Sequence, residues 1–476
     1  MNKLKFSYFI LGIIFFVYAF IRVFSVGLTY DEIWTITTFV PQNTLDIITY
    51  NTVESNNHLL NTLLIKLFFI FSNQDYVARL PNLFIFLIYI YYSYKITYYN
   101  FPFLVGLCCF FVLLANPFML EFFSLARGYG LALALLLASI HFLIYYIQGK
   151  GYKFAIISLL FGSLSVLSNF TSLNYFLAIL TLINFIPYID KKRNYLPSKL
   201  HFISVIISFT LFIIIYLPLK KLKINGILVY GGDSNLYHDT LLSLTKYCMC
   251  EVNNMELIYI VLNSFLIVLL VTLSISYYRN NKFLSIKNCL FLVLLLIFIE
   301  LEIQNKIFNI PFLTDRTAFF VYPLLILLLF FSVNDVLSKL YSSIIILTIA
   351  IGFTLNLFFS VNLYKTRMWF FDAHSEKILE LLQQKSKFNT VKIDFSWPLQ
   401  ASLFYYNIRN KYENFIIVNN MSDRIGYNRD ADYYVFLNKP LEEVGYNPHN
   451  QIISHEKFKK IFEFSEEGII IFEIKK

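Results

Sequence analysis

Long apolar runs recur along most of this sequence, and the first extends from about Phe6 to Val26. At about 1.5 Å per helical residue, a run of this length can cross the hydrocarbon layer of a membrane. Hydrophobic residues make up 58% of the chain, and charged residues make up only 14%. The sequence therefore predicts a polytopic α-helical membrane protein.

The apolar runs predict about eleven spanning helices, or about 11–13 if further runs cross or split. They lie near residues 6–26, 80–99, 101–116, 129–148, 154–170, 172–189, 200–218, 257–277, 284–303, 317–333 and 341–361. The first run lacks the small-residue cleavage pattern of a signal peptide, so we expect it to be retained.

Lys and Arg indicate the topology, because they collect in the short cytoplasmic loops of membrane proteins. The basic residues that are candidates for the cytoplasmic side are Lys3, Lys5, Lys95, Lys150, Lys153, those of 191–199 and 279–287, and Lys339. The segment from Leu28 to Asn57 contains no Lys or Arg, so we place it outside the cytoplasm. The N-terminus then lies inside, and everything after Tyr364 lies outside.

The run over residues 58–71 is interpreted as a helix that lies in the membrane interface. Its leucines and Phe68 form one helical stripe. Another side carries the polar residues His58, Asn61, Thr62 and Lys66. In an alternative, this run crosses the membrane and a neighbouring run splits, which leaves both ends of the chain on the same sides.

The composition changes after Tyr364, and residues 364–476 are predicted to form a small extracytoplasmic α/β domain. A helix is expected over 372–385, and strands over 389–395, 414–420, 432–437 and 468–474. Residues 1–363 are then the transmembrane domain, with 28–57 as its first outer loop. His and Cys show no zinc-site spacing, and the sequence neither requires nor rules out a divalent metal.

Two carboxylates, Asp31 and Glu32, follow directly after the first apolar run. The structural interpretation is a capping box, in which Thr29 caps a short helix and Glu32 reaches back to its amide. That leaves Asp31 with no comparable structural task. Because a carboxylate at membrane depth is costly to desolvate, Asp31 is a candidate general base whose pKa partial burial would raise.

Further polar residues are expected at the same outer face, namely His58, Arg79, Glu121, Arg127, Asp315 and Arg316. Each has a structural alternative. A buried Arg127 needs an anion, which Glu121 could supply, while His58 could be a packing residue and Arg316 could extend to the interface. Together with a base, however, arginines at one depth fit chemistry on an anionic lipid head group.

The order of these segments resembles that of GT-C membrane glycosyltransferases. The segments are "TYDE", "NNHLL", "ARLPN", "LARGYG" and "DRTAFFVYPLL", followed by an outer soluble domain. The likeness is greatest to the branch of protein O-mannosyltransferases and aminoarabinose transferases, the dolichyl-phosphate-mannose-protein mannosyltransferase-like family 39. It covers roughly residues 6–335, and it rests on order and spacing because no single motif is specific.

The resemblance implies a polyprenyl-phosphate-linked sugar as donor and inverting transfer to a hydroxyl or amine on the extracytoplasmic side. Asp31 matches the general base of the family, and Glu32 its catalytic neighbour. Arg127 matches the arginine that meets the lipid phosphate, and His58 the family's His-Pro-Pro-Leu position. The implied acceptor is a lipid, glycan or protein in or at a bacterial inner membrane, and no nucleic-acid partner is expected.

Arg79, Arg316 and His58 would assist Arg127 in binding the donor phosphate. The chain departs from the family in two places, since leucines replace the prolines after His58 and residues 128–130 read Gly-Tyr-Gly where relatives carry an acid. Glu121 is a possible second acid at a different position.

Two rival classes stay open at the level of sequence. A transporter or lipid flippase would more often show broken helices and ionisable residues deep within its spans. A polysaccharide polymerase or ligase would share the lipid substrate but would not need an acid pair in its first outer loop.

Overall fold

The computed structural model describes residues 3–475 apart from a set of internal gaps. The gaps are 191–196, 229–230, 250–251, 253, 280–283, 337–338, 388, 419–429, 442–444 and 449–457. The chain divides into two compact units. Unit 1 comprises Met1–Val23 and Phe39–Val361, and unit 2 comprises Phe24–Thr38 and Asn362–Lys476. The segment that carries Asp31 and Glu32 thus belongs to the same unit as the C-terminal residues.

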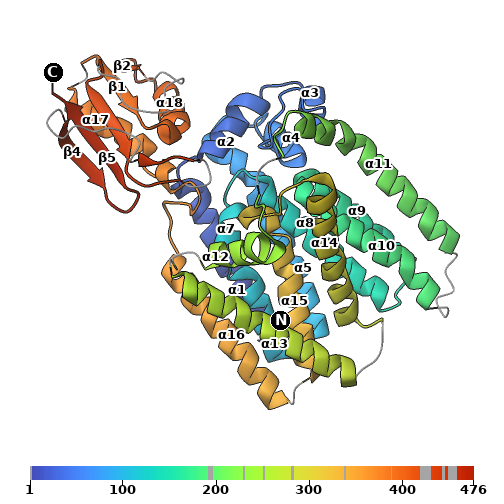
Figure 1. Ribbon diagram of the computed structural model, residues 1–476. Coiled ribbons are helices and arrows are strands. Elements are labelled where there is room, and N and C mark those ends of the chain that lie inside the picture. The colour runs from blue at the N-terminus through green and yellow to red at the C-terminus, as the bar shows by residue number, and fades with distance from the viewer. Residues whose placement is uncertain are drawn as a thin grey trace. The chain divides into compact units, whose positions relative to one another are not determined.

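Unit 1 is a bundle of helices (Figure 1). The longer ones are α1 (Lys3–Ser25), α4 (Leu59–Phe68), α5 (Leu80–Asn100), α6 (Phe103–Leu114), α8 (Gly128–Ile147), α9 (Tyr152–Ser168), α10 (Leu173–Ile189), α11 (Pro197–Ile224), α13 (Met255–Arg279), α14 (Ile286–Phe308), α15 (Val321–Val336) and α16 (Lys339–Ser360). Shorter helices are α3 (Thr44–Ile48), α7 (Pro117–Phe123) and α12 (Ser243–Cys248). A helix is therefore present at each of the eleven predicted runs.

Six helices in the described part of the chain are long and apolar enough to cross a membrane. They are α1, α8, α10, α11, α13 and α16. A seventh span is possible if α6 and α7, which are bent by 64° at their junction, count as one. The other predicted spans are shorter or more polar: α14, for example, contains Lys287, Glu300, Glu302 and Lys306.

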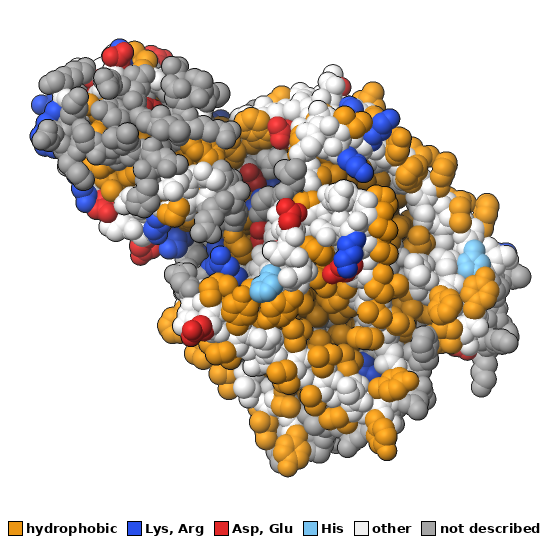
Figure 2. Space-filling model, in the orientation of Figure 1, with side chains coloured by type: hydrophobic (Ala, Val, Ile, Leu, Met, Phe, Trp, Pro, Cys, Tyr) orange, Lys and Arg blue, Asp and Glu red, His pale blue; other side chains and the backbone are white. Residues whose placement is uncertain are grey.

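The surface of unit 1 is apolar, and helix α8 lies in its interior. In the most apolar stretch of helix α8, 89% of the residues are buried inside the protein. The corresponding shares are 11% for α16 and 22% for α1. Hydrophobic side chains accordingly cover much of unit 1 in Figure 2. Because water does not favour an apolar surface of this extent, these helices are compatible with a protein whose surroundings are lipid.

Helix α4 is amphipathic in the predicted register, and its polar side is the one that packs inward. Asn61 and Thr62 are fully buried, while Leu67 is exposed. The Asn61 side chain donates to the Ala126 carbonyl and accepts from the Asn82 side chain, at 3.1 and 2.8 Å. Leu67 points outward, whereas Leu59 and Ile65 are buried together with the polar residues, so apolar side chains lie on more than one side of α4.

Unit 2 contains a five-stranded mixed sheet. Its strands are β1 (Val391–Phe395), β2 (Phe415–Ile417), β3 (Tyr433–Leu437), β4 (Phe458–Phe464) and β5 (Ile469–Ile474). The order is β2-β1-β3-β5-β4; β1 is parallel to β2 and β3, and β5 is antiparallel to β3 and β4. Four strands confirm the predicted ones, although residues 419–420 of the second lie outside the described residues.

Two helices of unit 2, α17 (Ser375–Lys385) and α18 (Gln400–Arg409), pack against each other. The first of them confirms the helix predicted over 372–385. The short helix α2 (Tyr30–Trp34) packs against α18. The residues that follow the first long helix are therefore part of the C-terminal unit's own packing.

Candidate functional site

His58 is the residue that precedes α4, and only 8% of its surface is exposed. Its Nε2 is buried and has no hydrogen-bond partner among the described residues, and its ring bonds to the backbone of Ser168 through the other nitrogen. The Tyr129 ring stands edge-on to the imidazole, with centroids 4.9 Å apart. His58 thus presents one nitrogen to the unit 1 interior with nothing bonded to it.

Burial lowers the pKa of His58 well below its ordinary value of 6.5. The positive charges of Arg127 and Arg316 lower this pKa further, while the bond to Ser168 acts in the opposite direction. The imidazole is therefore neutral near pH 7, and Nε2 is a hydrogen-bond acceptor. The structure brings His58 together with two of the predicted phosphate-binding arginines, and we call these three residues the His58 cluster.

Arg127 is the residue before α8, and it is 2% exposed. Its Nη1 donates to the side-chain oxygen of Asn56, and its guanidinium carbon lies 5.9 Å from the centre of the Tyr129 ring. The peptide before Arg127 is fixed by the Asn61 side chain, which donates to the Ala126 carbonyl. Several contacts thus hold this guanidinium group in a buried position.

Gly128 follows Arg127 in the "LARGYG" segment, and steric fit explains why this position is a glycine. A Cβ atom at this position would lie 2.1 Å from the Ser168 carbonyl oxygen and 2.7 Å from the Cβ of His58. Such distances are far inside van der Waals contact, so no other residue fits without movement of the backbone. Gly128 is therefore required for His58 and Ser168 to approach the start of α8.

Arg316 follows a strained residue at the start of a short 3₁₀ helix, Asp315–Ala318. Asp315 is 3% exposed and has φ +38°, in the left-handed region that residues with a side chain rarely adopt. Its backbone N–H donates to the Ser243 hydroxyl at 2.9 Å, and its carboxylate accepts from the Arg316 amide. These contacts fix the turn that presents Arg316 to His58.

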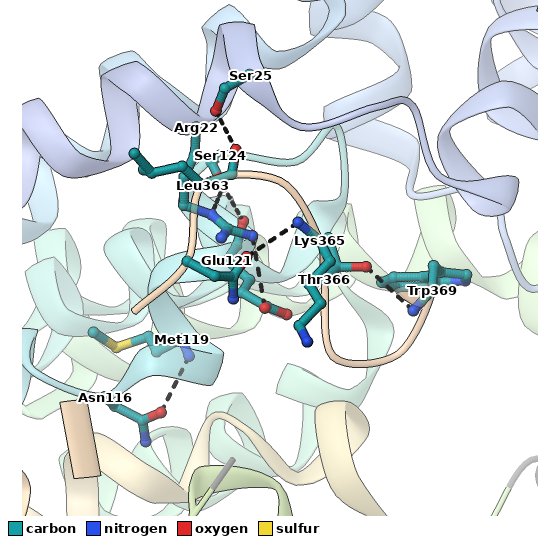
Figure 3. Close-up of polar contacts among 11 residues, drawn as sticks. Arg22, Ser25, Asn116, Met119, Glu121, Ser124, Leu363, Lys365, Thr366 and Trp369 are labelled. Atoms are coloured by element: carbon teal, nitrogen blue, oxygen red, sulfur yellow. Dashed lines mark hydrogen bonds and ion pairs between the residues drawn. The ribbon is translucent and has the colours of Figure 1, made fainter. Parts of the chain in front are cut away.

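Glu121, the possible second acid, forms a buried ion pair with Arg22 of α1 (Figure 3). The Arg22 Nη2 and Glu121 Oε1 atoms are 3.6 Å apart, and Arg22 is fully buried. The Arg22 Nε donates to the Ser124 hydroxyl at 3.3 Å. Arg22 lies inside the first apolar run, where a basic residue needs a partner, and Glu121 is a partner that no local sequence pattern identifies.

Arg79 is also buried, with 1% of its surface exposed, and it donates from Nη1 to the Val23 carbonyl at 3.2 Å. This bond ties the short 3₁₀ helix Asp75–Arg79 to the end of α1. The cations that act on His58 are Arg127 and Arg316. The role predicted for Arg79 in binding a phosphate stays a prediction. What the structure shows is its hydrogen bond to the Val23 carbonyl near the end of α1.

Asp31 and Glu32 lie in unit 2, at the start of α2, and we call residues 28–32 the Asp31 turn. The predicted capping box is present: the Thr29 amide donates to Glu32 Oε2 at 2.9 Å, and the Glu32 amide to the Thr29 hydroxyl at 3.4 Å. Glu32 is fully buried and Asp31 is half-buried. The geometry therefore gives Glu32 a structural task and leaves the Asp31 carboxylate nearer to solvent.

In the ranges that the structure describes, no group of three or more His, Cys, Asp or Glu residues is arranged to hold a metal ion. Trp397 packs edge-on against Tyr446 within unit 2, with ring centroids 6.0 Å apart.

Comparison of the chain with models of known protein families finds no match, and comparison with curated proteins finds none either.

Proposed function

We propose that this protein is a GT-C-like glycosyltransferase that uses a polyprenyl-phosphate-linked sugar as donor. The observation that carries the proposal is the His58 cluster, in which two arginines meet at a buried imidazole. Guanidinium groups suit the geometry of phosphate, because they donate hydrogen bonds from a planar fork. Two of them beside one buried imidazole would bind a phosphate group of the donor.

In the proposed reaction, Asp31 accepts the proton of the acceptor hydroxyl or amine as this group attacks the anomeric carbon. The bond between that carbon and the donor phosphate oxygen breaks on the opposite face, and its electron pair stays on the phosphate. Arg127 and Arg316 stabilise the charge that grows there. The product is a sugar with inverted configuration, and the lipid phosphate is the leaving group.

The proposal includes a membrane topology. The eleven predicted helices cross a bacterial inner membrane, the N-terminus lies in the cytoplasm, and unit 2 lies on the extracytoplasmic side. The apolar outer faces of α1, α13 and α16 support a lipid environment. The basic residues between the helices support the orientation.

The phosphate site can be tested with polyprenyl phosphate as the probe. Purified full-length protein in nanodiscs should bind this lipid more tightly than the same polyprenol without phosphate. Arg127→Gln and Arg316→Gln should each weaken binding about 10- to 100-fold, the loss expected for one charge-assisted hydrogen bond. Arg409→Gln, at the exposed end of α18, is the control. Equal binding of the phosphorylated and the free polyprenol would argue against a phosphate site.

The chemistry can be tested in a strain that lacks the protein. Wild-type protein should restore an envelope lipid or glycan that is heavier by one sugar residue, as measured by mass spectrometry. Asp31→Asn should reduce this product about 10²- to 10⁴-fold, since it removes the base. Asp46→Asn makes the same change in helix α3 and should have no effect. Sugar that crosses the bilayer without a new glycosidic bond would instead identify a transporter or flippase.

A further inference from the structure

Asp372 is a buried carboxyl group of unit 2 that the proposed mechanism does not use. This residue ends the short 3₁₀ helix Phe370–Asp372, and 2% of its surface is exposed. Its Oδ2 accepts a hydrogen bond from the Tyr30 amide at 2.6 Å. Its Oδ1 is buried and accepts no hydrogen bond from the described residues. A buried carboxyl oxygen without a partner requires an explanation, because burial of a polar atom is costly.

The contact with Tyr30 is one of three that hold consecutive amides of the Asp31 turn. The Leu28 amide donates to the Tyr406 hydroxyl at 2.9 Å, and the Thr29 amide donates to the carboxylate of Glu32. The Tyr30 amide donates to Asp372. Two of these three acceptors therefore come from the C-terminal part of unit 2. Because the next residue is Asp31, they fix the backbone that carries the candidate base.

Burial raises the pKa of Asp372 well above its ordinary value of 3.8. The negative charges of Asp31 and Glu32 raise this pKa further, whereas the Ser402 hydroxyl and the Tyr30 amide act in the opposite direction. When carboxyl groups are this close, a proton stays on the one whose charge is least well solvated. That group is Asp372, since Asp31 is half-buried and Glu32 accepts two hydrogen bonds from Thr29.

We propose that Asp372 is a positioning residue for Asp31, which holds the Asp31 turn through the Tyr30 amide while carrying a proton itself. In this state Oδ2 is the carbonyl oxygen that accepts from the amide, and Oδ1 carries the proton. The uncharged carboxyl group places no second negative charge beside Asp31. The inference rests on the proposed function only where it names Asp31 as a base, because the contacts and the proton belong to unit 2 alone.

Amide hydrogen exchange of the whole protein in nanodiscs tests the holding role without any sugar. The peptide that covers residues 27–34 should exchange about tenfold faster in Asp372→Ala and in Tyr406→Phe, each of which removes one acceptor. Asp372→Asn keeps a carbonyl oxygen for the Tyr30 amide, so exchange near neutral pH should stay as in the wild type. Asp394→Asn, a buried aspartate in β1, is the control and should not change this peptide.

Infrared spectroscopy tests the proton. Near neutral pH, the difference spectrum between the wild type and Asp372→Asn should contain the carbonyl band of one protonated carboxyl group, and the difference spectrum between the wild type and Asp394→Asn should not. Absence of this band from the first difference spectrum, or exchange of residues 27–34 that is as fast in Asp372→Asn as in Asp372→Ala, would overturn the proposal. If Asp372→Ala does not fold, hydrogen exchange in Tyr406→Phe tests the holding of the turn, and the infrared band tests the proton on Asp372.

These measurements separate the inference from the proposed function. If exchange and the infrared band agree with expectation while Asp31→Asn keeps full sugar transfer, the positioning role stands and only the identification of the base fails. If the base is confirmed but the band is missing, Asp372 is charged and the inference fails alone. In a working transfer assay, the wild type should lose activity at high pH, where Asp372 ionises. Asp372→Asn cannot ionise, so this loss should be absent from the variant.

Discussion

The His58 cluster and the Asp31 turn hold charged groups in two different ways. In the cluster, helices pack so closely that only glycine fits at position 128, and His58 and Arg127 are buried among them while Arg316 is half-buried. In the turn, single hydrogen bonds from side chains hold consecutive backbone amides. The first arrangement depends on volume and the second on individual bonds. Changes in packing should therefore cost much more than the loss of any one bond of the turn.

Gly128→Ala should have the largest effect, because the new Cβ would meet the Ser168 backbone at 2.1 Å. We expect a loss of more than about 4 kcal/mol of folding free energy, so that little folded protein accumulates. Size-exclusion chromatography of membrane extracts measures this. Gly352→Ala in α16 is the control, since nothing lies within 4 Å of its new Cβ. Normal accumulation of Gly128→Ala would show that packing does not hold the cluster.

Arg22→Met should come next, because it leaves the Glu121 carboxylate buried without its ion-pair partner. Loss of one member of a buried pair costs about 3–5 kcal/mol. The midpoint of thermal unfolding should fall accordingly, and the double variant Arg22→Met with Glu121→Leu should recover most of the loss. A double variant as unstable as Arg22→Met would mean that the charge on Glu121 is not the cause.

A third, smaller effect is the response of unit 1 to acid. The pKa of His58 is lowered in the folded state, so the stability that neutral His58 contributes is present above pH 6.5 and is lost as the pH falls toward the folded-state pKa. The thermal midpoint should fall with acidification below 6.5. His58→Gln should remove this part of the dependence of the thermal midpoint on pH. His201→Gln, which changes a half-buried residue of α11, should leave it in place. An unchanged profile in His58→Gln would contradict the assignment.

The smallest effect is expected for the capping box of the turn. Thr29→Ala removes the hydroxyl that accepts from the Glu32 amide, which costs about 1 kcal/mol. Asn43→Ala is a matched control, because Asn43 precedes α3 without a side-chain capping bond. Thermal unfolding of both variants gives the comparison. If the two variants lose equal stability, the capping box does not contribute in this protein.

The sequence predicts the local features well. Apolar runs located each long helix, because burial and span length both act over consecutive residues. The spacing of Thr29 and Glu32 predicted the capping box that the structure contains. Strand β4 was missed, since Lys459, Lys460 and Glu463 interrupt its apolar alternation, as is common in an edge strand.

What could not be predicted is which distant residues meet. A basic residue in the first apolar run indicated that a partner was needed, but no local pattern named Glu121 as the partner of Arg22. Asp372 lies in a segment without any motif, and its contact with Tyr30 joins residues 342 positions apart. The tertiary fold determines which of these residues pair. Neither hydrophobic periodicity nor helix and strand propensity predicts such a contact.

The distance along the chain between the Asp31 turn and its acceptors has a consequence for biosynthesis. Leu28 leaves the ribosome 378 residues before Tyr406, and Tyr30 leaves it 342 residues before Asp372. During translation the acid pair is therefore made long before two of the groups that accept from its turn. A nascent chain that is released before residue 372 carries the candidate base on a segment that lacks two of its three amide acceptors.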